Sequence, residues 1–167
     1  MNNTRTTVLL ALAVIASISA TTAAAEAQEG PAFHGWGLRA GVSDRPDQFL
    51  VGLQADFGEL IENLRFEPNV ELGVGDDQTI LSLGAPVFYR WPESGRFDFY
   101  GGGGIAVGFV ERDVADGPGE DDGFEFVIAP MLAGGLAWPV GESEAGVELA
   151  VTANELQNVK LVFRWMF

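Results

Sequence analysis

The fold is decided by one stretch of the sequence, Lys160-Leu161-Val162-Phe163-Arg164-Trp165-Met166-Phe167. Apolar and aromatic side chains occupy every second position of this stretch, at Leu161, Phe163, Trp165 and Phe167. The positions between them include both of its charges, Lys160 and Arg164. A period of two predicts a β-strand. A strand with large apolar side chains facing outward and charges facing inward is typical of a barrel that crosses a lipid bilayer.

Length and composition limit the alternatives. The chain has 167 residues, enough for one domain, and a formal net charge of −15. Such an acidic chain is a poor partner for nucleic acid, because phosphate binding needs a basic surface. The sequence contains no cysteine, which excludes disulfides, zinc–thiolate sites and thiol nucleophiles.

The N-terminal residues 1–27 have the pattern of a secretory signal peptide. Arg5 supplies the positive charge, and the apolar run from Val8 to Ala20 is too short to span a membrane. Small residues around Ala25 and Ala27 offer cleavage sites. An amphipathic N-terminal helix is the alternative, but the run has no polar face. We therefore expect residues 28–167 to form the folded domain of the exported protein.

Alternating runs separated by turn-like clusters fill that domain, which is the all-β pattern. The runs lie at about 36–43, 48–57, 64–74, 79–91, 97–110, 124–138, 145–153 and 158–167. They predict an eight-stranded antiparallel up-and-down transmembrane β-barrel. Because the strand number is even, both chain ends should lie at the periplasmic end. The longest connection, Glu111–Gly123, should lie outside the cell, as in outer-membrane barrels.

Aromatic residues gather at the strand ends that this topology places toward the periplasm. All four tryptophans of the chain belong to this group. Aromatic side chains at the membrane interface form the girdle expected of a transmembrane barrel. The predicted girdle consists of Trp36, Tyr89, Trp91, Phe97, Phe99, Trp138, Trp165 and Phe167. A thinner ring at the other end would consist of Phe49, Phe109, Phe124 and Phe126.

Charged residues of both signs occupy the opposite face of the predicted strands. By parity they are Arg39, Asp56, Arg65, Glu67, Glu71, Arg90, Asp98, Glu125, Glu148, Lys160 and Arg164. Charges confined in a narrow lumen must pair, since an unpaired buried charge costs several kcal/mol. Centring the last loop near Leu156 sets Glu148 opposite Arg164, and we predict that pair. Asp98 with Arg90 is a second candidate pair. The alternative is that these residues are solvated surface charges of a soluble sandwich.

Three prolines lie within the predicted strands, at Pro68, Pro86 and Pro130. Proline cannot donate a ladder hydrogen bond, and a closed barrel has no edge to accommodate it. We therefore expect bulges or local irregularity at these positions.

No motif predicts a cofactor or a catalytic site. The run Gly101–Gly104 continues as a strand, whereas a phosphate-binding loop needs a following helix. His34, the only histidine, has no identifiable catalytic partner. The acidic loop Glu111–Gly123 contains oxygen ligands suited to a weak divalent cation site, but its spacing does not match a calcium-binding loop. A solvated loop is the alternative.

The chain resembles the small outer-membrane β-barrel proteins, the porin-like superfamily with OmpA/OmpX-type barrels. The resemblance is carried by the signal peptide, by the strand FDFYGGGGIAVGF from Phe97, and by the C-terminal KLVFRWMF. Lys160, Trp165 and Phe167 fit the family's C-terminal assembly signal, while Val162 stands where glycine is common. The resemblance implies a bacterial outer-membrane location and recognition by the barrel assembly machinery. It does not specify an activity.

The leading functional hypothesis is a non-enzymatic, monomeric barrel in outer-membrane lipid, with a charge-filled lumen, acidic extracellular loops and a structural or surface-interaction role. A narrow pore and a lipid-modifying outer-membrane enzyme are alternatives. An enzyme would need a nucleophile or an acid–base group facing lipid, and parity places none there. A soluble lipocalin-like carrier is a further alternative, in which the aromatic face would line a cavity.

Overall fold

The computed structural model describes residues 32–75, 78–91, 96–112, 124–153 and 156–167. Ten β-strands are present in this part of the chain. They are β1 (Gly35–Asp44), β2 (Gln48–Asp56), β3 (Glu59–Ile61), β4 (Leu64–Phe66), β5 (Asn69–Val74), β6 (Gln78–Arg90), β7 (Asp98–Arg112), β8 (Phe124–Val140), β9 (Ser143–Thr152) and β10 (Val159–Met166). None of the described residues belongs to a helix long and apolar enough to cross a membrane.

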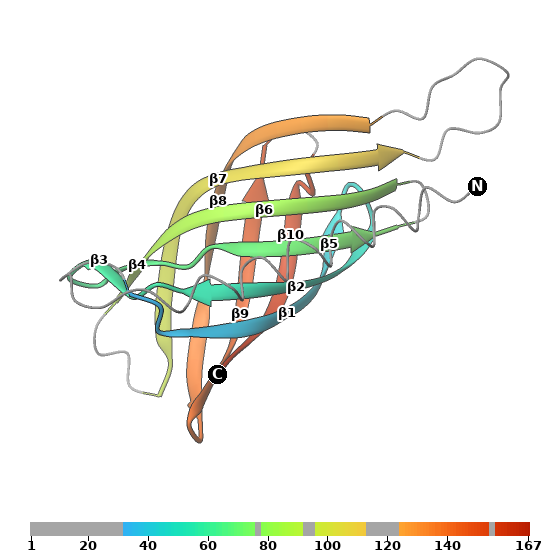
Figure 1. Ribbon diagram of the computed structural model, residues 1–167. Helices are drawn as coiled ribbons and strands as arrows, with labels where there is room; N and C mark the ends of the chain where they lie inside the picture. Colours follow the sequence, from blue (N-terminus) through green and yellow to red (C-terminus); the bar gives the residue numbers. More distant parts are fainter. Residues whose placement is uncertain (1–31, 76–77, 92–95, 113–123, 154–155) are drawn as a thin grey trace, which may run out of the picture.

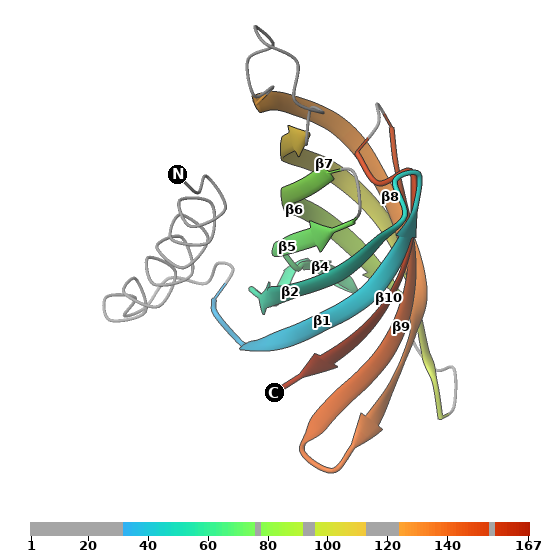
Figure 2. The same ribbon diagram turned by 90° about the vertical axis from the view of Figure 1, so that its right-hand side faces the viewer.

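The strands form a closed antiparallel barrel (Figures 1 and 2). β1 pairs with β2, β2 with β5, and both β4 and β5 with β6, while β6 to β10 pair in sequence order. β1 closes the barrel against β10, from Gly37 opposite Met166 to Asp44 opposite Val159. β4 and β5 are consecutive parts of one strand of the wall. β3 is a short extension after β2 that pairs with β4 and adds no strand to the wall. The closed wall therefore has eight strands. The fold class predicted from the sequence is confirmed, and each predicted strand matches an observed one to within two residues at either end.

The break between β4 and β5 has a local cause. Both strands keep one register against β6, with Leu64 opposite Tyr89 and Asn69 opposite Gly84. Between them the Glu67 amide donates to the Pro86 carbonyl at 3.3 Å, but Pro86 has no amide to return a bond. The expected irregularity at Pro68 is therefore confirmed as an interruption of the ladder.

The bulges expected at Pro86 and Pro130 are absent. The β6–β7 register runs unshifted through Pro86 opposite Gly104, and the β7–β8 register runs unshifted through Pro130 opposite Ile105. At Pro86 the irregularity appears instead as the interruption of the ladder toward β4 and β5. At Pro130 the expectation was wrong, because a proline removes only its own donor. At Pro130 the carbonyl still accepts from the Ala153 amide at 3.1 Å.

Side chains alternate between the lumen and the outside of the barrel. In β10, Leu161 and Phe163 are exposed, whereas Val162 and Arg164 are buried. The same alternation runs through β1, where Leu38 and Val42 face out and Arg39 and Ser43 face in. The buried core is thus the lumen, and the exposed wall is apolar.

Candidate functional site: the filled lumen and the apolar wall

The outer wall exposes large apolar side chains from every long strand. Leu132 in the middle of β8 is 68% exposed, and Ile105 on β7 and Leu149 on β9 are also exposed. Wall exposure on this scale is unfavourable in water, because apolar patches of soluble monomers rarely exceed a few hundred Å². The wall is therefore a surface for lipid, with its polar groups turned inward.

The predicted girdle residues gather at one end of that wall. Three ring pairs are in contact: Trp36 with Phe167 at 4.6 Å, Tyr89 with Trp91 at 5.4 Å, and Phe97 with Trp138 at 6.1 Å between centroids. Phe99 is exposed and Trp165 is half-buried on the same outward face. The Phe167 amide donates to the Trp36 carbonyl at 2.8 Å, so the C-terminal residue lies within this ring.

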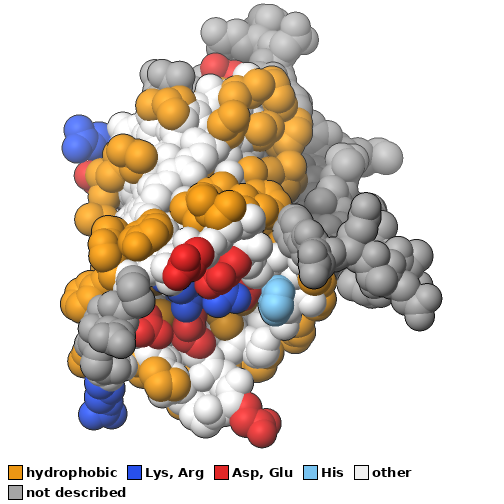
Figure 3. All heavy atoms as spheres, turned by 90° about the vertical axis from the view of Figure 1, so that its left-hand side faces the viewer, with side chains coloured by type: hydrophobic (Ala, Val, Ile, Leu, Met, Phe, Trp, Pro, Cys, Tyr) orange, Lys and Arg blue, Asp and Glu red, His pale blue; other side chains and the backbone are white. Residues whose placement is uncertain are grey.

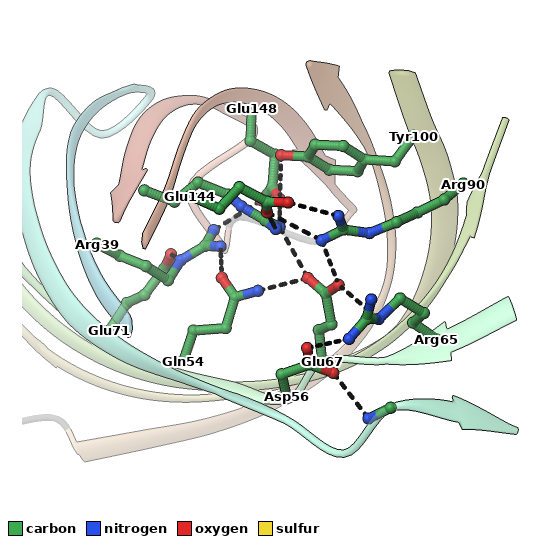
Figure 4. A network of polar contacts seen from close by, with 12 residues as sticks. Arg39, Gln54, Asp56, Arg65, Glu67, Glu71, Arg90, Tyr100, Glu144 and Glu148 are labelled. Atoms are coloured by element: carbon green, nitrogen blue, oxygen red, sulfur yellow. Dashed lines mark hydrogen bonds and ion pairs between the residues drawn. The ribbon is translucent and has the colours of Figure 1, made fainter. Parts of the chain in front are cut away.

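The lumen contains a network of hydrogen-bonded charges (Figure 4). Arg39 lies at one side of it. Its Nε donates to Glu71 Oε1 at 2.6 Å, its Nη1 to Gln54 Oε1 at 2.6 Å, and its Nη2 to Glu148 Oε1 at 2.7 Å. Lys160 Nζ donates to the second oxygen of Glu71 at 2.5 Å. This part of the network joins β1, β2, β5, β9 and β10 across the lumen.

A second part of the network surrounds Glu67 and Glu144. Arg164 donates to Glu67 Oε2 and to Glu144 Oε1, both at 2.8 Å. Arg90 donates to Glu144 Oε2 at 2.7 Å and to Glu67 Oε1 at 3.0 Å. Gln54 links the two parts, because its Nε2 donates to Glu67 Oε2 at 2.6 Å.

Tyr100 of β7 fills the remaining space beside these charges. The Arg164 guanidinium lies 4.7 Å from the centroid of the Tyr100 ring, and the Tyr100 hydroxyl donates to Glu148 Oε2 at 3.2 Å. Gly135 of β8 faces the same space, where an added Cβ would stand 2.7 Å from the Tyr100 hydroxyl oxygen. A glycine at this position therefore allows the tyrosine to reach the network.

The network opens toward the end of the barrel that carries the girdle. There Arg65 of β4 pairs with Asp56 of β2, and both are partly exposed. Figure 3 shows acidic and basic side chains gathered at the centre of this end, with hydrophobic side chains around them. The outermost pair of the network is thus accessible to solvent at the girdle end, whereas the inner members are buried.

The charges of the network balance. Its five basic residues are Arg39, Arg65, Arg90, Lys160 and Arg164, and its five acidic residues are Asp56, Glu67, Glu71, Glu144 and Glu148. Three buried guanidinium nitrogens, the Nε atoms of Arg65, Arg90 and Arg164, have no hydrogen-bond partner among the described residues. Removing one member of such a buried set costs about 3–5 kcal/mol, because a partner charge remains in a dry site. The network therefore holds the strands in one arrangement.

Toward the end opposite the girdle, the part of the lumen lined by β6, β7 and β8 is apolar. Ile80, Ala106, Val110, Ala129 and Met131 of β6, β7 and β8 form a buried cluster with Leu156. Leu156 comes from the connection between β9 and β10 and is 2% exposed. We call this group of six residues the Leu156 cluster.

The next residue anchors the same connection on the polar side of the lumen. Gln157 Nε2 donates to Gln48 Oε1 at 2.9 Å, and both side chains are buried. Gly108 and Gly73 leave the room that Leu156 and Gln157 occupy, since an added Cβ at either glycine would collide with those side chains. Leu156 and Gln157 therefore turn into the barrel and fill part of the lumen at the end opposite the girdle.

Most of the predicted lumen charges are brought together. Arg39, Asp56, Arg65, Glu67, Glu71, Arg90, Glu148, Lys160 and Arg164 are all members of the network. Asp98 is half-buried and lies opposite Ala137 at the start of β7. Glu125 is exposed near the start of β8, on the lumen side opposite Val110, and so lies beyond the network.

The predicted Glu148–Arg164 ion pair is present, but its predicted register needs correction. Glu148 lies opposite Val162, and Arg164 lies opposite Gly146, so the β9–β10 register differs by two residues from the prediction. The loop is not centred on Leu156, because Leu156 and Gln157 turn into the lumen. Glu148 still comes within 4.0 Å of Arg164, as a diagonal contact.

Arg90 does not pair with Asp98. Arg90 lies opposite Tyr100 and extends across the lumen to Glu67 and Glu144. The prediction considered only neighbours along the chain, and a closed barrel also brings β6 within reach of β9.

Sequence reasoning missed four network or closing residues: Gln54, Tyr100, Glu144 and Gln157. Glu144 was assigned to a turn, although it shares its parity with Glu148. Gln54 and Tyr100 share their parity with Asp56 and Asp98 in the same way. Parity was therefore the available signal for these three, whereas nothing in the sequence indicates the inward fold at Gln157.

The remaining candidate motifs, at His34 and at Gly101–Gly104, form no catalytic or ligand-binding site among the described residues. His34 is exposed before β1, and Gly101–Gly104 form part of β7. The described residues contain no group of three histidine, aspartate or glutamate side chains that could hold a metal ion. Residues 113–123, which include most of the candidate divalent-cation loop, lie outside the described residues, as does the predicted signal peptide.

Comparison with known proteins identifies the fold. No protein-family model and no curated protein matches the sequence. Among solved structures, the N-terminal β-barrel domain of Pseudomonas aeruginosa OprF is 14% identical, with a TM-score of 0.62 over 84% of this chain and 100% of that one. Neisserial surface protein A is 17% identical, with a TM-score of 0.51 over 79% of this chain and 90% of that one.

The outer membrane enzyme PagL is a third similar structure, 14% identical with a TM-score of 0.51 over 80% of this chain and 99% of that one. The chain therefore has the fold of small eight-stranded outer-membrane barrels. Its outward apolar wall, an observation independent of this likeness, places it in lipid, and the bacterial outer membrane is the membrane in which such barrels reside.

Proposed function

We propose that the protein is a non-enzymatic integral outer-membrane barrel with a closed lumen, acting as a structural or surface-interaction component of the envelope. The observation that carries this proposal is the charge-balanced network, whose side chains come from every wall strand except β8. A narrow eight-stranded barrel filled in this way leaves its side chains, rather than water, in the interior.

The Leu156 cluster supports the same proposal independently. A permeating ion would have to pass an apolar side chain at one end of the lumen and the ion-paired network at the other. The aromatic face lies on the outside, whereas a soluble lipocalin-like carrier would need it around an internal cavity. The soluble alternative is therefore not the function that this geometry supports.

Planar-bilayer recording tests the closed lumen. We expect the purified barrel to show no large steady conductance. The double variant Glu67→Gln/Leu156→Ala, which loosens both ends of the lumen, should conduct more often than the wild type. A large steady conductance of the wild-type protein would refute the proposal and favour the narrow-pore alternative.

The enzyme alternative has its own test, prompted by the similarity to PagL, whose structure is described as that of an outer membrane enzyme. Mass spectra of lipid A and of phospholipids from overexpressing cells should match those of cells without the protein. A new deacylated or acylated species would overturn the non-enzymatic proposal.

Export and assembly are part of the proposal. N-terminal sequencing of the mature protein should start near Glu26 or Gln28, after removal of the signal peptide. The C-terminal strand, with Trp165 on the wall and Phe167 in the girdle, should direct recognition by the barrel assembly machinery. Sedimentation in detergent should give a monomer.

A further inference from the structure

One hairpin lies at the girdle end of the barrel beside the wall. The segment of β3, its turn and β4 lies at the far left of Figure 1, at the same end as the girdle. Its edge strand β3 pairs only with β4 among the described strands. Leu60 and Ile61 on this strand are 42% and 67% exposed. We call residues 57–66 the periplasmic hairpin.

The hairpin is held in a defined position. The Gly58 amide donates to Asp56 Oδ1 at 2.7 Å, and Asp56 also pairs with Arg65 on the returning strand. Gly58 has a positive φ of 72°, which suits glycine at the bend between β2 and β3. On the other side, the Arg90 amide donates to the Asn63 carbonyl at 2.8 Å. The exposed leucine and isoleucine are therefore presented by ordered backbone.

The apolar surface of the hairpin is continuous with the girdle. Phe57 lies 5.9 Å from Phe66 and 6.1 Å from Phe33, measured between ring centroids. Leu64 lies opposite Tyr89, which contacts Trp91 of the girdle. An apolar surface that is continuous with the lipid-facing wall is expected to face lipid as well.

The hairpin also exposes two carboxylates, Glu59 and Glu62, on either side of Leu60 and Ile61. In the described part of the hairpin the only basic residue is Arg65, which is already paired with Asp56. Exposed carboxylates around an apolar tip complement a headgroup that carries an ammonium group, and they are repelled by a purely anionic surface.

We propose that the periplasmic hairpin is a lipid-binding anchor that inserts Leu60 and Ile61 into the periplasmic leaflet, with Glu59 and Glu62 at the ammonium groups of zwitterionic phospholipids such as phosphatidylethanolamine. The inference rests on the proposed outer-membrane function. Because the anchor lies on one side of the barrel, the β2–β4 side of the wall should insert more deeply into the leaflet than the opposite side.

Single-cysteine spin labelling tests the anchor in the intact barrel, because the chain has no native cysteine. The variants are Ile61→Cys, Leu132→Cys in the middle of the wall, and Glu142→Cys in the β8–β9 turn at the same end. In vesicles containing phosphatidylethanolamine, the label at position 61 should be several-fold less accessible to a water-soluble nickel chelate than the label at position 142. Its access to oxygen should rise accordingly.

The controls separate the two proposals. A label at position 61 with the accessibility of position 142 would overturn the anchor. A label at 61 that excludes both nickel and oxygen would also overturn it, because it would indicate a protein partner or a second copy. High nickel accessibility at position 132 would instead contradict the membrane barrel itself. Equal depth of the position 61 label in phosphatidylethanolamine and in phosphatidylglycerol vesicles would refute the role given to the two glutamates.

Discussion

Replacing Glu71 by glutamine should destabilise the barrel, because it leaves the buried Lys160 without a counter-charge. Glu71 and Lys160 are 1% and 4% exposed, and Glu71 is the only acidic partner of the Lys160 ammonium in the described network. Arg39 keeps its ion pair with Glu148 in the variant, whereas Lys160 loses its counter-charge. An uncompensated buried charge of this kind costs about 3–5 kcal/mol. The free energy of unfolding should fall by that amount, which corresponds to at least about two powers of ten in the unfolding equilibrium.

Urea unfolding in lipid vesicles measures this change, with the four tryptophans and the heat-dependent gel mobility of the folded barrel as two readouts. The matched control is Asp44→Asn, because the Asp44–Arg45 pair has side chains 59% and 77% exposed. An exposed pair contributes only about 0–1 kcal/mol. The double variant Glu71→Gln/Lys160→Met removes the orphaned charge and should recover most of the stability. If Glu71→Gln is as mild as Asp44→Asn, the lumen is hydrated and the reasoning from a dry, paired network is wrong.

Three further predictions concern the outer end of the lumen, the wall and assembly. Leu156→Ala should lower the free energy of unfolding by about 2–5 kcal/mol, because it empties the buried Leu156 cluster, and an unchanged urea midpoint would show that the loop does not pack there. Leu132→Arg, on the exposed middle of β8, should cost about 2–4 kcal/mol in vesicles, whereas Glu142→Arg in the adjoining turn should change stability by no more than about 0.5 kcal/mol. Trp165→Ala combined with Phe167→Ala should slow the appearance of the heat-modifiable folded form in cells, and an unchanged rate would argue against the assembly signal.

The strand content of this chain was predictable because its barrel strands alternate cleanly. In β10 every inward position is buried and the outward positions are exposed or half-buried, as the alternation in the sequence required. Each predicted strand could therefore be placed to within two residues. The sequence also predicted which face points outward. Charges on one face and tryptophans at the ends of the other face are expected only when the charged face lines the lumen and the tryptophan face contacts lipid.

The pairing of the charges was not predictable, because it depends on distances across a closed lumen. Arg90 and Glu144 lie far apart in the sequence, yet they make a 2.7 Å contact because β6 and β9 face each other through the interior. The predicted pairs Asp98–Arg90 and Glu148–Arg164 were chosen from adjacent strands, where only local turn geometry was considered. For Glu148 and Arg164, a different centre of the β9–β10 connection shifted the register by two residues.

The terminal stretch from Lys160 to Phe167 shows both sides of this division. Its alternation alone determined a strand, a lipid-facing side and an inward side, because side-chain direction in a strand depends only on position along the chain. Only the closed barrel decided that Arg164 binds Glu67 and Glu144, that Lys160 binds Glu71, and that Phe167 stacks on Trp36. These contacts join strands that the chain brings together only when β10 closes against β1, and no local pattern encodes the register of that closure.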